Sequence, residues 1–274
     1  AHDLLQENNK LSDEIEKQFR DISNYCRGKC HNPLGENRME TNPEFTFNYD
    51  IDKWLDDKLD ISSLNELVLT GSDVRDSYLH RPNPTWGNVT HADCNYGAAP
   101  HVVLGKTQWS NWHIYRGMFW FDLSAIPGAE VQSSSLEFYV DAVVTNANTG
   151  QPVTTTQTYT LYPLLKDWTE GLENNMPVQQ ASGVTWNNAM DNLTGVDYAW
   201  TTTGASDRTL DRGSSIDSLV DTPANMQGTW ITFNSTNFTD QIQEWVNGSS
   251  ANYGILFQGS ENTNKPDGSM IRIT

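Results

Sequence analysis

Residues 113–124 read HIYRGMFWFDLS, a run rich in aromatic and large apolar side chains that the pair Pro127-Gly128 soon stops. Such a run predicts a strand buried at the centre of a sheet sandwich. The next segment, residues 135–144 (SLEFYVDAVV), begins by alternating apolar and polar side chains, which gives one core face and one solvated face. We therefore predict two neighbouring core strands joined by a short connection through Pro127 and Gly128.

The chain beyond residue 67 carries further apolar runs separated by turn residues. We expect a short helix over 240–246 and strands near 67–70, 74–79, 101–105, 113–122, 135–144, 156–165, 229–234, 253–258 and 269–273. The long segments 80–100, 145–155 and 166–228 are expected to be loops, which commonly carry binding function on a rigid scaffold. Most of the ten tryptophans should lie in the core, among them Trp120, Trp186, Trp230 and Trp245.

The first 66 residues follow a different pattern. Five apolar side chains recur at helical spacing, which predicts an amphipathic helix: Leu4, Leu11, Ile15, Phe19 and Ile22. A second short helix is predicted over 50–59. We divide the chain into an N-terminal helical arm and linker, residues 1–66, and a β-sandwich domain, residues 67–274. The apolar stripe of the arm must be covered, either by its own sandwich or by a neighbouring subunit.

The composition indicates an exported protein. Asp and Glu number 35 against 17 Lys and Arg, and the formal charge of −18 argues against binding to nucleic acid or to anionic membranes. No apolar run approaches the ~20 residues of a membrane span. Thr, Asn, Ser and Gly crowd the second half, and the chain begins at Ala1 rather than Met, as after signal-peptide removal. We expect an extracellular or cell-surface location.

Three cysteines leave their pairing open. In an oxidising compartment a disulfide forms between Cys26 and Cys30, or from either one to Cys94, and one thiol is left over. The alternative is covalent haem. Cys26, Cys30 and His31 resemble the C-x-x-C-H attachment motif, but three residues separate the two cysteines where the motif has two. A Soret band in the absorption spectrum would distinguish the two.

The sequence lacks the G-x-S-x-G, H-E-x-x-H, P-loop and Rossmann patterns, and we expect no enzymatic activity. A binding site is better supported. Two aromatics stand beside an amide at the predicted strand entrance, where rings stack on a sugar and polar groups bind its hydroxyls. These candidate ligand-binding residues are Trp109, Asn111, Trp112 and His113.

Calcium is a reasonable structural ligand for this chain. Acidic loops supply the carboxylate and carbonyl oxygens that this hard cation prefers. The candidate ligands crowd one loop, although they lack the register of a defined calcium motif: Asp207, Asp211, Asp217 and Asp221.

Several blocks of the chain resemble, in order, the DNRLRE-type domain, an extracellular β-sandwich module related to a family of carbohydrate-binding modules. The blocks span roughly residues 70–274. They are VRDSYL (74–79), WG (86–87), RG with FDLS (116–124), WTEG (168–171), VTWNN (184–188), EWVNG (244–248) and NYGIL (252–256). The resemblance implies a non-enzymatic module that binds glycan.

We therefore expect an all-β fold, a jelly-roll-like antiparallel β-sandwich with an N-terminal helical arm. The first functional hypothesis is an extracellular carbohydrate-binding or adhesion module with a glycan as partner. Its charge of −18 should repel acidic polysaccharides unless calcium bridges them. The alternative is a structural subunit of an extracellular filament, surface layer or virus particle, which binds copies of itself through the N-terminal helix.

Sedimentation separates these two hypotheses. If the arm is an assembly device, the intact chain should form large assemblies, whereas a chain that starts at Leu67 should be a monomer. If the arm covers its own domain, both chains should sediment as monomers.

Overall fold

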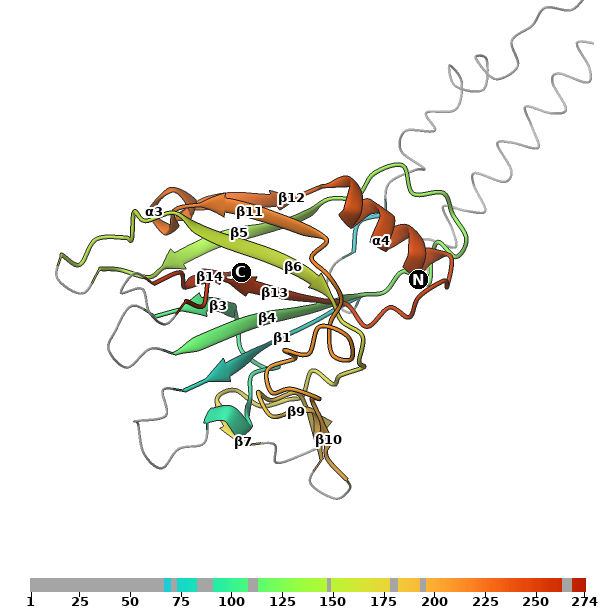
Figure 1. Cartoon of the computed structure of the whole chain (residues 1–274), viewed down its shortest axis with the longest axis horizontal. Coiled ribbons are helices and arrows are strands. Elements are labelled where there is room, and N and C mark those ends of the chain that lie inside the picture. The colour runs from blue at the N-terminus through green and yellow to red at the C-terminus, as the bar shows by residue number, and fades with distance from the viewer. Residues whose placement is uncertain are drawn as a thin grey trace, which may run out of the picture. The chain divides into compact units, whose positions relative to one another are not determined.

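The described part of the chain is all-β and is built mainly from one nine-stranded sheet, in which neighbouring strands are antiparallel (Figure 1). The computed structural model describes residues 67–69, 73–82, 91–107, 113–146, 149–177, 182–192, 196–262 and 268–274. The predicted N-terminal arm and linker, residues 1–66, lie outside these ranges. The prediction of a helical arm therefore stays a prediction.

The nine strands form two halves that join at β4. The first half contains β1 (Val74–Arg81), β4 (Ile114–Phe121), β13 (Ile255–Gly259), β6 (Gln157–Pro163) and β11 (Asp217–Asp221). The second half contains β3 (Val102–Lys106), β14 (Ile271–Ile273), β5 (Leu136–Val143) and β12 (Thr229–Phe233). Strand β4 begins by pairing with β3 and continues by pairing with β13. The sheet is nearly closed, because Ser235, after β12, donates its N–H to Asp217 of β11 at 2.8 Å.

The main hydrophobic core lies between the two halves of the sheet. Phenylalanine rings from both halves meet there: Phe138 of β5 lies 4.8 Å from Phe119 of β4 and 5.2 Å from Phe257 of β13, between ring centroids. Phe233 of β12 completes the group, 5.1 Å from Phe257. Burial of these side chains provides the main driving force for folding the two halves together.

A second hydrophobic core covers the other face of β1, β4 and β13. It is formed by the segment after β6, which contains only short strands: β7 (Met176–Pro177), β8 (Ser182–Gly183), β9 (Asn188–Asn192) and β10 (Tyr198–Ala199). Trp168, Trp186 and Trp200 are buried there with Met118 of β4. The segment before β3 adds the 3₁₀ helix η3 (His91–Asp93) and β2 (Cys94–Asn95), which pairs with β7.

A buried arginine lies within this second core. Arg116 of β4 donates two hydrogen bonds of 2.7 Å to the carboxylate of Glu261, and a third of 2.7 Å to the hydroxyl of Ser206. It also donates to the carbonyl of Gly204, and its guanidinium carbon lies 4.8 Å from the Trp186 ring. The buried positive charge is therefore fully paired, as its low-dielectric surroundings require.

Two helices flank strand β12 in the sequence. Helix α3 (Pro223–Met226) precedes β12, and α4 (Thr236–Val246) follows it. The hydroxyl of Ser235 caps α4 by accepting a hydrogen bond from the N–H of Phe238, and one face of this helix packs into the main core. None of the described helices is long and apolar enough to cross a membrane.

Most predicted strands are confirmed within two residues. These are β1, β3, β4, β5, β6, β12, β13 and β14. The helix predicted over 240–246 is also present, but it begins four residues earlier, at Thr236. The predicted loop 166–228 is wrong in part, since it contributes β11 to the main sheet and strands β8, β9 and β10 to a sheet of their own.

Three further predictions are wrong. Strands β4 and β5 are not neighbours, because β3 and β14 lie between them in the sheet order. Residues 67–69 form no strand. Trp230 is not a core residue: its side chain is 65% exposed. Strand β12 alternates, so burial of Ile231 and Phe233 on one face places Trp230 on the other.

The close approach of two strands at Gly254 provides a test of the fold. Gly254 has a φ of +84°, and a Cβ there would collide with the carbonyl group of Phe119 in β4. Gly228 has a similar φ of +74°, but its Cβ would meet no heavy atom within 4 Å. Alanine at either position has to adopt the left-handed conformation, at a cost of about 1–2 kcal/mol.

Overpacking adds roughly 1–3 kcal/mol at Gly254 alone. We therefore expect Gly254→Ala to lower the free energy of unfolding, measured by urea denaturation, clearly more than Gly228→Ala does. Equal losses in the two variants would contradict the close packing of β4 against the start of β13.

Candidate functional site

Of the predicted sugar platform, the structure describes His113 alone; Trp109, Asn111 and Trp112 lie outside the described residues. His113 directly precedes β4. Its backbone N–H donates to the Thr107 hydroxyl at 2.8 Å, and its carbonyl accepts from the Thr107 N–H at 3.0 Å. Thr107 and His113 are therefore joined by one backbone–backbone bond and one bond to the Thr107 hydroxyl.

The imidazole of His113 belongs to a histidine–tyrosine cluster, which comprises His80, His91, His113, Tyr96 and Tyr115. The register of β1 and β4 places His80 opposite Tyr115, and their rings stack with centroids 4.4 Å apart. The rings of His91 and His113 each lie 5.0 Å from that of His80. Three histidines that are distant in sequence thus meet at one end of β1.

Hydrogen bonds fix the tautomers within the histidine–tyrosine cluster. The hydroxyl of Tyr96 donates its proton to Oδ1 of Asn175 at 2.7 Å, so it accepts the bond of 2.8 Å that joins it to Nδ1 of His80. The opposite nitrogen of His80, Nε2, then accepts from Nδ1 of His113 at 2.8 Å. His80 is consequently neutral, with its proton on Nδ1.

Burial lowers the pKa of His80 to about 3, and the neighbouring His113 and His91 contribute to the same shift. Burial also lowers the pKa of His113, with His91 as a second cause. Desolvation penalises the charged imidazolium, and a proton on Nε2 of His80 would remove the acceptor that His113 needs. We interpret this cluster as a neutral support for the start of β4.

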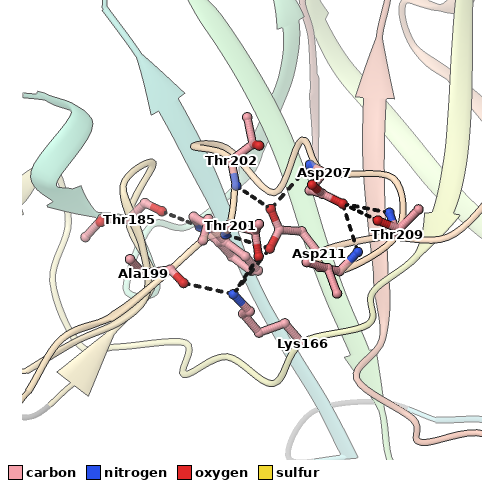
Figure 2. A network of polar contacts seen from close by, with 10 residues as sticks. Lys166, Thr185, Ala199, Thr201, Thr202, Asp207, Thr209 and Asp211 are labelled. Carbon is pink, nitrogen blue, oxygen red and sulfur yellow. Dashed lines mark hydrogen bonds and ion pairs between the residues drawn. The ribbon is translucent and has the colours of Figure 1, made fainter.

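The predicted calcium ligands do not meet at one place. Asp211 is fully buried, and its carboxylate accepts the backbone N–H groups of Thr201 and Thr202 at 2.8 and 2.9 Å (Figure 2). Lys166 lies 3.3 Å from the same carboxylate. Asp207 accepts the N–H and hydroxyl of Thr209, each at 2.8 Å. Burial raises the pKa of Asp211, but the hydrogen bonds outweigh it and lower the pKa overall.

Asp217 and Asp221 lie on β11 and have other partners. Asp217 accepts from the backbone of Ser235, and Asp221 accepts from the side chain of Asn225 at 2.8 Å. Within the described ranges, no three His, Cys, Asp or Glu side chains are grouped as a metal site. In the described residues these four carboxylates accept from backbone N–H groups, from hydroxyl and amide side chains, and from Lys166.

The predicted disulfide and haem residues, Cys26, Cys30 and His31, lie outside the described residues. Cys94 is described: its side chain is buried in the main core, and burial is the first cause that raises the pKa of its thiol, followed by the charge of Asp93.

Among the described residues, the most exposed tryptophan lies on the outer face of the second half of the sheet. Trp230 of β12 pairs with Tyr139 of β5, and the ring centroids are 5.5 Å apart with an interplanar angle of 57°. Trp230 is 65% exposed, whereas Tyr139 is half-buried. The two rings form a wedge that opens to solvent.

An arginine–aspartate pair lies beside this wedge. The register of β14 and β5 shifts by one residue, so that Asp141 and Ala142 together oppose Arg272. This β-bulge brings the carboxylate of Asp141 to the guanidinium of Arg272, at 2.7 Å from Nη2 and 2.9 Å from Nε. We call the four residues Trp230, Tyr139, Asp141 and Arg272 the outer-face site.

Asp141 and Arg272 each stabilise the charged form of the other. Hydrogen bonding to Arg272 lowers the pKa of Asp141, and hydrogen bonding to Asp141 raises the pKa of Arg272. His101 lies nearby, and burial lowers its pKa first, with the positive charge of Arg272 as the second cause. At neutral pH the outer-face site therefore holds one ion pair and an uncharged imidazole at its side.

The alternation within residues 229–233 (TWITF) could have revealed the exposure of Trp230 from the sequence, since Ile231 and Phe233 share one face. By contrast, the sequence around Asp141 and around Arg272 does not indicate that the two side chains pair. Their positions are 131 residues apart, and the bulge that joins them depends on strand register.

No family model, curated protein or solved structure matches the chain.

The low pKa of His80 predicts a loss of stability in acid. The unfolded chain binds a proton near pH 6.5, whereas the folded protein resists protonation down to about pH 3. Below about pH 6.5 each further pH unit should lower the free energy of unfolding by up to about 1.4 kcal/mol from this group.

Urea denaturation at pH 7 and pH 4.5 measures this effect. The His80→Gln variant should be less stable at pH 7, because it loses the bonds to Tyr96 and His113, but it should lose less stability on acidification. His101→Gln is the control, because this imidazole is less buried than that of His80 and should change the pH dependence less. An unchanged pH dependence in His80→Gln would show that His80 does not stay neutral in the folded state.

Proposed function

We propose that the chain is a non-enzymatic, extracellular carbohydrate-binding or adhesion module, and that the outer-face site contacts the glycan. The observation that carries this proposal is the exposure of Trp230 beside Tyr139. Trp230 is 65% exposed, and its apolar surface is unfavourably hydrated, so a sugar ring stacked on it would remove this surface from water and gain binding free energy.

The chemistry of the outer-face site matches that of a sugar. A pyranose ring has an apolar face of C–H groups, which stacks on an aromatic ring, and an equator of hydroxyls that donate and accept hydrogen bonds. The Trp230–Tyr139 wedge offers the apolar surface, and Arg272 offers donors beside it. Thr232 and Glu137, a cross-strand pair on the same outward face, add a hydroxyl and a carboxylate.

Two features of the sequence agree with this proposal. The resemblance to the DNRLRE-type domain, which is related to carbohydrate-binding modules, implies a glycan ligand. The predicted residues Trp109, Asn111 and Trp112 have the same aromatic and amide chemistry and remain a second candidate contact. We also propose that the nearly closed antiparallel sheet follows a jelly-roll-like path, as the sequence predicts.

Affinity electrophoresis and titration calorimetry against a panel of soluble polysaccharides test the proposal. We expect Trp230→Ala to weaken binding about tenfold or more, which corresponds to about 1.4 kcal/mol. The melting temperature should change little, since the removed ring is mostly exposed. Tyr198→Ala is the matched control, because Tyr198 is 52% exposed and lies on β10, outside the outer-face site.

Tyr198→Ala should bind as tightly as the unmodified protein. Binding that survives Trp230→Ala unchanged would move the glycan site elsewhere, with Trp109 and Trp112 as the next residues to replace. No binding to any polysaccharide would refute the proposed function.

A further inference from the structure

We infer that the outer-face site selects a neutral glycan over a carboxylated one, and that the Asp141–Arg272 pair sets this preference. The inference rests on the proposed function and goes beyond it, because it assigns the chemical class of the ligand and the residues that determine it.

The outer-face site has the shape of an extended row across the sheet. Trp230, Tyr139 and Arg272 lie on β12, β5 and β14, which are consecutive in the sheet order. Two strand spacings, about 10 Å across the sheet, separate Trp230 from Arg272, which are also offset along β5, since Trp230 pairs with Tyr139 and Arg272 pairs with Ala142. A glycan chain that crosses the strands therefore meets the aromatic wedge first and the guanidinium of Arg272 next.

The wedge favours a soluble, flexible chain over a flat surface. The Trp230 and Tyr139 rings are inclined by 57° and are not coplanar. Two inclined rings cannot both lie flat on the ordered face of a crystalline polysaccharide. They can contact two sides of one sugar unit, or two units of a twisted chain.

Arg272 has donors that its partner does not use. Its Nε and Nη2 atoms bind the two oxygens of Asp141, whereas Nη1 makes no hydrogen bond to any described residue. The side chain is 39% exposed, so solvent and ligands can reach it. Since a guanidinium carries five N–H donors in a fixed plane, Asp141 holds the remaining ones in place for a ligand hydroxyl.

The charge around Arg272 disfavours an anionic ligand. Asp141 is ionised and cancels the positive charge of the guanidinium through its bidentate contact. Glu137 is exposed on the same face of β5 and adds a second carboxylate, and His101 has a lowered pKa that keeps it neutral. Two carboxylates against one guanidinium leave this face slightly negative within a chain whose net charge is −18. A ligand carboxylate would therefore be repelled, whereas sugar hydroxyls carry no such penalty.

The experiment removes the neutralising carboxylate. Binding of a hydroxyl-only β-glucan and of a polygalacturonate, each as a soluble polymer, is measured by affinity electrophoresis at low salt for the full chain and its variants. The Asp141→Asn variant should gain at least about tenfold in affinity for the polygalacturonate, because Arg272 then presents an uncompensated charge, and added salt should reverse the gain. Glu137→Gln is the matched control, because it makes the same change in net charge on the same strand but frees no arginine.

Glu137→Gln should change polygalacturonate affinity less than about threefold. Arg272→Lys, which keeps the charge but loses the planar fork, should weaken β-glucan binding severalfold. Asp141 and Arg272 are partly exposed, so the variants should remain folded, and their melting temperatures verify this.

Three outcomes would overturn the inference. One is a preference of the unmodified chain for polygalacturonate, another is an equal gain in Asp141→Asn and Glu137→Gln, and the third is β-glucan binding that depends on Trp230 but is unaffected by Arg272→Lys. These outcomes differ from failure of the proposed function, in which neither polymer binds and Trp230→Ala has no effect.

Discussion

Strand β4 is covered on both faces, and this constraint explains why the fold has two cores. Its side chains alternate: Phe119 points into the main core between the two halves of the sheet, and Met118 points into the second core. A strand that is apolar on both faces cannot leave either face in water. The long segment after β6 therefore folds back over β1, β4 and β13 with three buried tryptophans. Strand β4 also carries Arg116. Its ion pair with Glu261 compensates for the burial of the guanidinium charge in the second core.

Polar groups, more than apolar ones, define the path of the chain in the second core. The segment after β6 has few regular strands, so its backbone N–H groups need partners other than a sheet. Asp211 satisfies three of them, those of Thr201, Thr202 and Asp207, from a fully buried position. The carbonyl of Thr185 accepts from the indole of Trp200 at 3.0 Å. Asn95 plays a similar part, since its side-chain amide donates to the carbonyls of Glu170 and Val184. Irregular backbone is thus held by individual side chains, each of which fixes a small number of residues.

The sequence predicts those features that depend on local pattern. The period-two alternation around Phe138 and the aromatic run of β4 placed the main strands correctly, because burial acts on each strand separately. Pairing depends on the whole chain, so the local pattern gave no sign that β3 and β14 separate β4 from β5. Asp207 and Asp211 are predicted calcium ligands because acidic residues crowd their loop, but residue type alone does not show that these carboxylates accept from backbone N–H groups. Trp230 was assigned to the core from residue type alone, although its neighbours in β12 showed the alternation that exposes it.

The three buried tryptophans of the second core have a consequence for the resistance of the protein to proteases. Long irregular segments are usually the first to be cut by proteases, because they open locally while the rest of the domain stays folded. Here the segment that carries Trp168, Trp186 and Trp200 cannot open without exposing the face of β4 on which it packs. Cleavage within it should therefore follow opening of the whole domain, at a rate set by global stability. The irregular segment after β6 would then resist proteolysis as well as a regular sheet does.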